Sequence, residues 1–580
     1  MRSLFPILLC LVAIYIYSCA NQGTPTGGPR DTIPPLLIES TPANKSINYK
    51  SKEFHFVFDE RIDASKIKQK LVITPFTENK YKHRIKKNEL FIEFEEDFED
   101  STTYTFNFAD GVVDVTEKNS VENFILAFST GPYIDSISIS GTIRNLYNNK
   151  KVDKATVTLY DVSDTLNILT GKPRYFAKTD TSGTYKIENI KNSYYQIYAF
   201  EDKNNNLTNQ PDEETQGFIK DSIDLNSNKE NIDLAIQLLN INDLKMIRAK
   251  KTGQYFDVLY NKYIQSYQMK KLDSMSKLPL PKSNLIKERT TLRYYYDSAY
   301  QYEKDSLAVI IQTTDTVYNH MSDTVYVQFS ESKRKPEKFN SSLLPRDQSN
   351  VDEKFNMIIR FTKPITEFYR DSMILQYDTL YKQNIPDSIL QWNEDMTELV
   401  ISNQLNKNFF KHKVDSLLNL LTDSTHIPQD SSAIDTVKVK QVNYLTKIKT
   451  NQVYYLFKKG TFISIDLDTA EQQTRFYQFK NPENYGIVSG QVETTNPSYT
   501  LQLVDKDYKV IAQKKNPTKF IFNYVKPGKY TFRVLIDKNE DQTWTHGNLN
   551  LQMEPEPIYF YPEEFDIRAN WEIENILISF

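Results

Sequence analysis

Apolar and polar residues alternate with a period of two along most of this 580-residue chain. Phe54, Phe56 and Phe58 are separated by single residues, and residues 104–108 repeat the same pattern. This period is typical of strands that bury one face. Tyr and Phe are frequent, and clusters of Asn, Asp and Ser separate the apolar runs. The pattern predicts an all-β chain of tandem β-sandwich modules.

One segment, residues 404–421, departs from this period. Its apolar residues fall at i, i+4, i+7, i+8 and i+11, which is one face of a helix: Phe410, Val414, Leu417, Leu418 and Leu421. The segment therefore predicts one inserted amphipathic helix. Two interpretations stay open, a flap that binds a partner protein or a helix that covers the core of its own module.

Two internal repeats indicate that the modules are of two kinds. Alignment of Asp202 with Asp537 pairs these residues without a gap: Tyr185 with Phe520, Ile187 with Phe522, Ile190 with Val525, Lys191 with Lys526 and Tyr195 with Tyr530. Upstream, Ser140-Gly141 matches Ser489-Gly490, so each copy begins with a Ser-Gly strand. A looser repeat relates residues 58–62, 260–264 and 361–365, and the middle copy is the least similar.

The first residues have the pattern of an export signal. Arg2 precedes an apolar run at 4–16, and the small residue Ser18 precedes Cys19. The run is shorter than the ~20 apolar residues that span a bilayer, so it predicts a cleaved lipoprotein signal peptide with Cys19 acylated. A retained short anchor is the alternative. Because each buried methylene contributes about 0.8 kcal/mol, more than one acyl chain would anchor the protein stably.

Composition and charge exclude several function classes. The net charge is −4 without a basic block, which argues against nucleic acid as a partner. Cys10 and Cys19 are the only cysteines, and the six histidines are scattered, so no thiolate nucleophile and no paired histidine ligands are expected. No nucleophile with a base and no phosphate-binding glycine loop is found, and the chain is predicted not to be an enzyme.

Two loops have the oxygen spacing of a calcium site. Residues 202–213 place oxygen-bearing side chains at alternate positions and carboxylates at both ends, and Ca²⁺ takes six to eight oxygen ligands. The candidate ligands are Asp202, Asn204, Asn206 and Glu213, with a weaker set in the second copy, Asp537, Asn539 and Asp541. The alternative is that these residues form Asx turns without a metal ion.

The segment 31–132 resembles the bacterial Ig-like domain of surface proteins. The matching residues are Pro34-Pro35, Ser40-Thr41-Pro42-Ala43, Phe58-Asp59-Glu60, Tyr104-Thr105-Phe106 and Phe128-Ser129-Thr130-Gly131. The two Ser-Gly copies resemble the carboxypeptidase-regulatory, transthyretin-like sandwich, and the whole chain resembles Ig-like-domain outer-membrane lipoproteins of Bacteroidota. This resemblance implies an address at the outer membrane, on a face that stays undecided between periplasmic and extracellular.

The predicted organisation therefore has seven segments. They are a signal peptide at 1–18, a flexible tether at 19–35, an Ig-like domain at 36–132, a transthyretin-like sandwich at 133–238, a divergent Ig-like domain at 239–335, an Ig-like domain with the helix at 350–484, and a second transthyretin-like sandwich at 485–580.

The tripeptide Asp-Ser/Thr-aliphatic recurs along the chain and resembles the O-glycosylation acceptor of exported Bacteroidota proteins. Candidate acceptors include Thr316, Thr324, Ser372, Thr379 and Ser388. The alternative is a turn Asp followed by strand residues, which this fold would repeat without any sugar.

These features predict a non-enzymatic lipoprotein scaffold held in the outer membrane by acyl chains on Cys19. Because lipoproteins of the resembled kind commonly accompany β-barrels, we hypothesise an accessory subunit of an outer-membrane β-barrel complex for assembly or export, with other envelope proteins as partners. The alternative is a surface glycan-binding or adhesive protein in which Trp544 and residues 294–296 stack on sugar rings.

Overall fold

The computed structural model describes residues 31–122, 124–252, 255–275, 277–296, 306–329, 337–377, 381–422, 441–443, 445–447 and 451–580. The chain divides into two compact units. Unit 1 comprises residues up to Asn145 together with Lys150–Gln210 and Glu214–Ile236, and unit 2 comprises Leu146–Asn149, Pro211–Glu213 and Gln237–Phe580.

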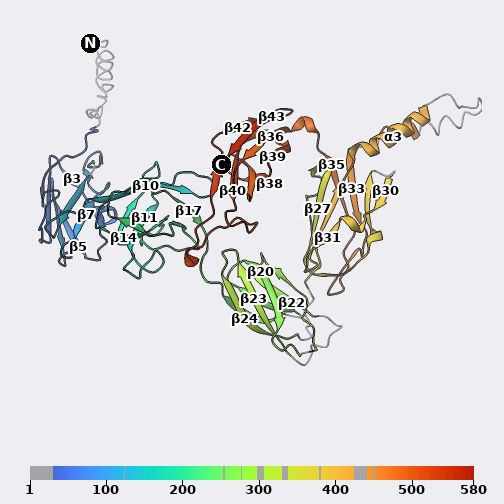
Figure 1. Cartoon of the computed structure of the whole chain (residues 1–580), viewed down its shortest axis with the longest axis horizontal. Helices are drawn as coiled ribbons and strands as arrows, with labels where there is room; N and C mark the ends of the chain where they lie inside the picture. The colour runs from blue at the N-terminus through green and yellow to red at the C-terminus, as the bar shows by residue number, and fades with distance from the viewer. Residues whose placement is uncertain are drawn as a thin grey trace, which may run out of the picture. The chain divides into compact units, whose positions relative to one another are not determined.

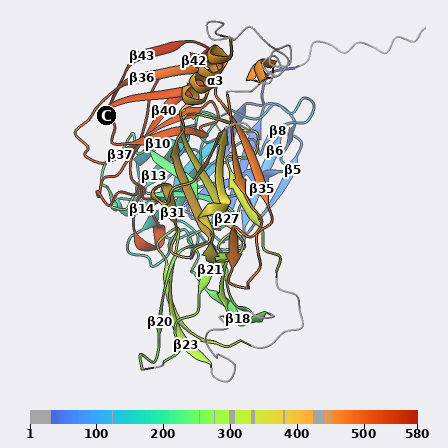
Figure 2. The ribbon, with the colours of Figure 1, turned by 90° about the vertical axis from the view of Figure 1, so that its right-hand side faces the viewer.

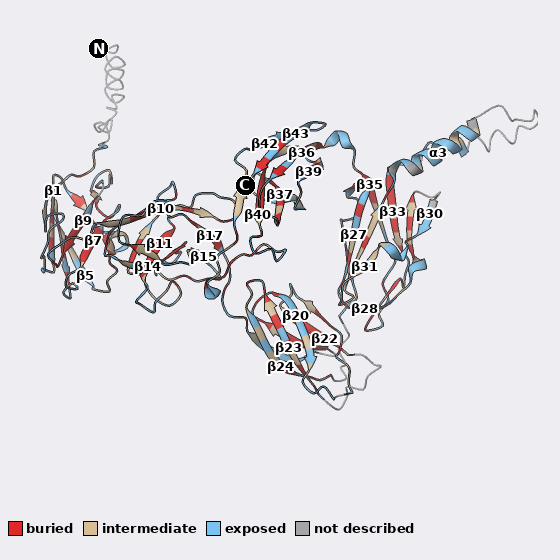
Figure 3. Cartoon of the chain, viewed as in Figure 1, coloured by how far each residue is buried: buried red, intermediate tan, exposed pale blue. Residues whose placement is uncertain are grey.

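Among the described residues, five groups of strands follow one another, and each encloses a hydrophobic core. We call them modules 1 to 5. Buried and exposed residues alternate along their strands, as the sequence pattern predicted (Figure 3). Strands predominate in the described residues, and α3 Lys407–Thr422 is the longest of the described helices, so the predicted all-β fold class with one inserted helix is confirmed (Figure 1).

Module 1 lies in unit 1. Its elements are β1 Leu37–Thr41, β2 Glu53–Phe58, β3 Ile62–Asp63, α2 Ile67–Lys70, β4 Val72–Thr74, β5 Tyr81–Lys86, β6 Glu89–Phe94, β7 Thr103–Asn107, β8 Val113–Asp114 and β9 Ile125–Ser129. They form a sheet of order β1-β2-β6-β5, a second of order β4-β7-β9, and the pair β3-β8. Phe54, Phe106 and Phe128 pack together between the two sheets.

Module 3 repeats this plan in unit 2. Its strands are β18 Met246–Thr252, β19 Tyr255–Tyr260, β20 Ile264–Lys271, β21 Ser283–Ile286, β22 Thr291–Tyr295, β23 Leu307–Asp315 and β24 His320–Val327. They form sheets of order β18-β19-β22-β21 and β20-β23-β24.

Module 4 is the largest sandwich and carries the inserted helix. Its elements are β25 Ser341–Leu344, β26 Asn350–Val351, β27 Lys354–Phe361, β28 Ile365–Phe368, β29 Met373–Tyr377, β30 Tyr381–Asn384, β31 Leu390–Trp392, β32 Glu398–Gln404, α3 Lys407–Thr422, β33 Gln452–Phe457, β34 Phe462–Ser464 and β35 Gln473–Phe479. The sheets have the orders β25-β27-β32-β31 and β26-β35-β33-β29-β30, and Figure 2 shows this module from the side.

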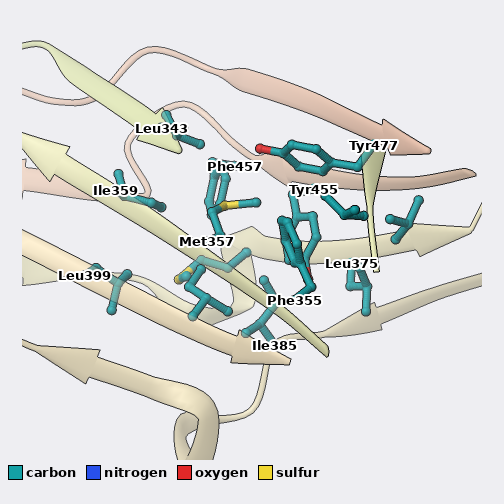
Figure 4. Packing of buried hydrophobic residues seen from close by; sticks show 14 of the residues in the cluster. Leu343, Phe355, Met357, Ile359, Leu375, Ile385, Leu399, Tyr455, Phe457 and Tyr477 are labelled. Atoms are coloured by element: carbon teal, nitrogen blue, oxygen red, sulfur yellow. The ribbon is translucent and has the colours of Figure 1, made fainter. Parts of the chain in front are cut away.

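The core of module 4 contains aromatic rings from both sheets. Phe355 of β27 lies with its ring centroid 5.6 Å from that of Tyr455 and 4.9 Å from that of Tyr477 (Figure 4). In α3, Val414 is buried and Leu418 packs against this core, whereas Leu420 is 73% exposed. The helix thus covers part of its own module, and it begins and ends close to the predicted bounds.

Modules 2 and 5 share a second plan. Module 2 has β10 Ile137–Asn145, β11 Thr156–Asp161, β12 Tyr175–Lys178, β13 Thr184–Ile190, β14 Ser193–Phe200, β15 Thr215–Phe218, β16 Ile223–Leu225 and β17 Leu234–Leu238. Module 5 has β36 Gly486–Glu493, β37 Tyr499–Asp505, β38 Val510–Lys515, β39 Lys519–Val525, β40 Gly528–Ile536, β41 Ile558–Phe560, β42 Phe565–Ile567 and β43 Glu572–Ser579. In each, the first strand pairs antiparallel with the fourth and parallel with the last.

The Ser-Gly repeat has a steric reason. A Cβ atom at Gly141 would lie 2.0 Å from the carbonyl oxygen of Ile232, and one at Gly490 would lie 2.1 Å from that of Ile576. In module 2 the segment that leads into β17 passes against Gly141, and in module 5 the last strand, β43, passes against Gly490. Only glycine permits such a close approach of two backbones.

The repeated tyrosine and lysine positions form a tyrosine corner in each copy. The hydroxyl group of Tyr195 donates a hydrogen bond to the carbonyl oxygen of Lys191, and that of Tyr530 to the carbonyl oxygen of Lys526, both at 2.9 Å. This bond joins the start of a strand to the turn before it, as in other β-sandwiches.

The looser repeat also has one register in modules 1, 3 and 4. Ile62 pairs with Asp114, Ile264 with Asp315 and Ile365 with Ser464. In each case the second partner begins a turn that a backbone hydrogen bond closes, from Asp114, Asp315 or Ser464 to a carbonyl oxygen four or five residues later. The middle copy, which is the least similar in sequence, thus has the same arrangement.

The residue two positions before each isoleucine is charged. In module 3, Lys262 forms an ion pair of 2.5 Å with Asp315, and both side chains are at most 7% exposed. In module 4, Lys363 lies 2.7 Å from Asp466 and is 2% exposed. In module 1 the residue is Glu60, whose pKa is raised by burial and by nearby carboxylates, first that of Asp114.

Replacement of Tyr195 by Phe should loosen module 2. The carbonyl oxygen of Lys191 would lose its partner, which costs about 1 kcal/mol. Hydrogen exchange of peptides from β14 should therefore become faster in Tyr195→Phe. Tyr194→Phe is the matched control, because Tyr194 is 55% exposed, and its exchange should match that of the wild type. Equal hydrogen-exchange rates of β14 in the two variants would contradict a stabilising role of the hydrogen bond between Tyr195 and Lys191.

Replacement of Lys262 by Met should destabilise module 3 by about 3 kcal/mol, because it leaves the fully buried Asp315 without its cation. Exchange of β23 peptides measures this loss. Lys245→Met is the control, since Lys245 is 70% exposed and 3.9 Å from Asp243. An unchanged exchange rate in Lys262→Met would contradict this prediction. It would mean that the backbone amides around Asp315 stabilise its carboxylate without the lysine.

Candidate functional site

The predicted calcium loop of module 2 follows β14. Asp202 is buried, and its two carboxylate oxygens accept the amide hydrogens of Asn206 and Leu207, both at 3.1 Å. The side-chain oxygens of Asn204 and Asn206 accept the amide hydrogens of Asn206 and Thr208. The oxygen atoms that the spacing assigned to a cation therefore hold the loop backbone in Asx turns.

The carboxylate that closes this loop is one residue away from the predicted one. Glu213 is exposed. Glu214 is 1% exposed, and its carboxylate accepts the amide hydrogens of Lys203 at 2.8 Å and Gln210 at 3.0 Å. Sequence spacing could not distinguish the two neighbouring glutamates, because the choice depends on which of them faces the inside of the fold.

The second loop has the same construction. Asp537 is 5% exposed, and its Oδ2 accepts hydrogen bonds from the amide of Gln542 at 2.8 Å and the hydroxyl group of Ser498 at 2.6 Å. Glu556, which is also buried, accepts the amide hydrogens of Lys538 and Asn539. The sequence analysis missed Glu556, because it lies far along the chain and no spacing rule links it to the loop.

Asn539 and Asp541 of this loop are exposed. Asp541 accepts hydrogen bonds from the amide and hydroxyl groups of Thr543, and these bonds lower the pKa of Asp541. Among the described residues, no three His, Cys, Asp or Glu side chains are grouped so that they could hold a metal ion. Calcium binding at the two loops stays a prediction.

The chain after the second loop contacts other parts of unit 2. Nδ1 of His546 lies 2.7 Å from the hydroxyl oxygen of Tyr147, and the tyrosine oxygen is also 2.9 Å from Oε1 of Gln237. Arg533 of β40 donates to the carbonyl oxygen of Tyr147 at 2.7 Å. The residues 146–149 are thereby fixed to module 5.

The same segment also contacts module 3 and the chain before it. The side-chain amide of Asn548 donates to the carbonyl oxygen of Val317 at 2.6 Å, and the side-chain amide of Asn550 donates to the carbonyl oxygen of Ile241 at 3.0 Å. Residues 544–550, which we call the contact segment, therefore join three stretches of unit 2 that lie far apart in the sequence.

The aromatic residues proposed to stack on sugar rings do not form an exposed platform. Tyr294 and Tyr295 are 0% and 1% exposed. Tyr294 belongs to the core of module 3, and Tyr295 lies in a small separate cluster with Tyr255 and Ile465. Trp544 is half-buried, and its Nε1 donates to the carbonyl oxygen of Glu556 at 3.1 Å. This part of the prediction is wrong, because the two rings lie on opposite faces of β22 and both faces are covered, that of Tyr294 by the core of module 3 and that of Tyr295 by Tyr255 and Ile465.

The candidate glycosylation residues differ in accessibility. Thr316, Thr324 and Ser388 are exposed, and Ser372 is half-buried. Thr379 lies outside the described residues. Sugar attachment at these positions stays a prediction.

The predicted signal peptide and the lipidation residue Cys19 lie outside the described residues. Among the helices that the structure describes, none is both long enough and apolar enough to cross a membrane.

Comparison with known proteins identifies one part of the chain. Residues 31–130 match the family model described as bacterial Ig-like domain. Module 1 has the bacterial Ig-like fold. The match covers this module and not the rest of the chain, and no curated protein matches the chain significantly.

Several solved structures are weakly similar. The major pilin subunit BcpA of Bacillus cereus has 10% identity and a TM-score of 0.12, covering 77% of this chain and 99% of the pilin. The S-layer protein rSbsC has 10% identity and a TM-score of 0.14, covering 86% and 64%. PorU from Porphyromonas gingivalis has 6% identity and a TM-score of 0.22, covering 57% and 35%. At such scores these similarities carry no argument about function.

The contact segment should loosen as the pH falls. Desolvation lowers the pKa of His546, so this group is neutral when the segment is in place. When the segment opens, His546 is in water and binds a proton at its ordinary pKa near 6.5. The neutral His546 therefore stabilises the closed segment above that pH, and this stabilisation is lost as the pH falls below it. Hydrogen exchange of residues 544–550, corrected for the intrinsic rate, should increase from about pH 7.5 to about pH 5.5.

His546→Gln should remove most of this pH dependence. His320→Gln is the control, because His320 is an exposed residue of β24 and its replacement should leave the dependence unchanged. A pH dependence that survives in His546→Gln would assign the effect to another group.

Proposed function

We propose that the protein is a non-enzymatic lipoprotein scaffold of the outer membrane and an accessory subunit of a β-barrel complex. The N-terminal pattern that ends at Cys19 supports the anchor. Other envelope proteins are the proposed partners, and the acyl chains on Cys19 hold the scaffold near them.

The proposal is carried by the N-terminal sequence pattern that predicts an acyl anchor, together with five sandwich cores along the described chain. Each core encloses most of the large apolar residues of its own module, so the outer faces of several modules are available for contact with other proteins. Module 1, which follows the tether, matches a domain family described as bacterial Ig-like.

The glycan-binding or adhesive alternative has lost two of the aromatic residues on which it was based, since Tyr294 and Tyr295 are buried. It is retained as the second outcome of the experiment below.

Replacement of Cys19 by Ala should abolish the anchor. Metabolic labelling with a fatty acid should tag the wild type and Cys10→Ala but not Cys19→Ala, because only the thiol of Cys19 is predicted to remain in the mature chain.

The accessory-subunit proposal is tested by purification of the tagged wild-type protein from its own membrane with a mild detergent. A β-barrel protein should co-purify with it in stoichiometric amount.

The control for that extraction is another lipoprotein of the same membrane, tagged and expressed at the same level. A β-barrel recovered equally with both baits is a bystander. Recovery of the protein alone would overturn the accessory-subunit proposal and favour the adhesive alternative, and labelling of Cys19→Ala would overturn the anchor.

A further inference from the structure

Unit 1 contains a cleft of about 570 Å³ between modules 1 and 2. Module 1 contributes residues of α2, β4, β7 with the loop after it, and β9. Module 2 contributes residues of β12 and β13, Lys154 from the loop before β11 and Asn205 from the loop after β14. Its volume lies within the range of small-molecule binding sites, roughly 300–1,000 Å³. Neither the predicted calcium ligands nor the contact segment lines this cleft.

The walls of the cleft are fixed to one another. The amide of Phe76 donates to the carbonyl oxygen of Arg174 at 2.6 Å, and the side chain of Asn189 donates to the hydroxyl group of Thr105 at 2.8 Å. Arg174 also forms an ion pair of 3.1 Å with Glu99. These bonds join module 1 to module 2 directly, so the cleft is a preformed feature of unit 1.

Positive charge predominates in the cleft. Four lysines line it with two carboxylates: Lys70, Lys154, Lys178 and Lys186 with Asp110 and Glu188. Two of the lysines are paired within the cleft, Lys70 with Asp110 at 2.9 Å and Lys186 with Glu188. The bond from Lys70 lowers the pKa of Asp110, so that carboxylate is charged at neutral pH.

The other two lysines have no carboxylate of the cleft as their partner. Lys178 donates to the side-chain oxygen of Asn205, a neutral group, at 2.6 Å. Lys154 lies 3.8 Å from Asp153, which is outside the cleft lining, and 80% of its side chain is exposed. The cleft therefore retains two ammonium groups that an anion can approach, and such groups bind phosphate and carboxylate as point charges.

The remaining lining is a mixture of hydroxyl, amide and apolar groups. The polar groups are those of Gln69, Thr74, Thr105, Asn107 and Asn205, and the apolar surface comes from Val72, Ile125, Phe176 and Ile187. Hydroxyl and amide groups can exchange hydrogen bonds with sugar hydroxyls, and apolar side chains contact the C–H faces of sugar rings.

We propose that this cleft binds an acidic saccharide, whose phosphate or carboxylate group lies against Lys154 and Lys178. The inference goes beyond the scaffold proposal and does not depend on it, because it rests only on residues of modules 1 and 2. It also gives the two modules a ligand-binding role that neither has alone, since each supplies one wall.

The test is isothermal titration of the purified full chain with glucose 6-phosphate and with digalacturonate, and maltose as the neutral probe. We expect at least one anionic probe to bind, more weakly at high salt than at low salt, and maltose to bind more weakly. Lys154→Met with Lys178→Met should weaken anion binding by at least about tenfold, because methionine keeps the apolar stem and removes the charge.

The matched control is Lys82→Met with Lys86→Met. These two lysines are exposed on β5 of the same unit and lie outside the cleft. The control variant therefore loses the same two positive charges as the cleft variant, but its affinity for the anions should stay unchanged. Circular dichroism checks that both double variants are folded. A preference for one anion assigns the phosphate or the carboxylate. Absence of binding by both anions, equal binding of maltose, or equal loss in the two double variants would overturn the proposal.

Discussion

In modules 1, 3 and 4 the chain passes from one sheet of the sandwich to the other at an isoleucine paired with the first residue of a tight turn. Ile62, Ile264 and Ile365 occupy this position. The pairing brings two distant segments together and encloses the core between the sheets. In modules 3 and 4 the residue two positions before the isoleucine is a buried lysine that forms an ion pair with a carboxylate of the turn. Removal of one partner of a buried ion pair is strongly destabilising, because it leaves the other charge buried without a partner.

Modules 2 and 5 depend on a different constraint, the close approach of two backbones at Gly141 and Gly490. Their long loops after β14 and β40 are stabilised internally, because buried carboxylates such as Glu214 and Glu556 accept hydrogen bonds from loop amides. A loop that satisfies its own backbone in this way can present its remaining residues outward. In module 5 those residues form the contact segment, and in module 2 the loop supplies Asn205 to the cleft.

These features relate the architecture to the two proposals. Sandwiches that each close their own core leave their polar faces and junctions for recognition, as in other modular proteins whose loops and interfaces carry function. The scaffold proposal uses the anchor and the outer faces, whereas the cleft uses the junction of modules 1 and 2, where Lys154 and Lys178 come from one module and the facing wall from the other.

The sequence by itself determined the all-β class, the two repeats, the amphipathic helix and the N-terminal signal pattern, because each depends on periodicity or on residues that are close in the chain. It could not distinguish Glu213 from Glu214, show that Tyr294 and Tyr295 are buried, or place Lys70 and Lys178 in one cleft. Those outcomes depend on which face of a strand meets the core and on which distant strands pair, and only the tertiary structure decides long-range pairing.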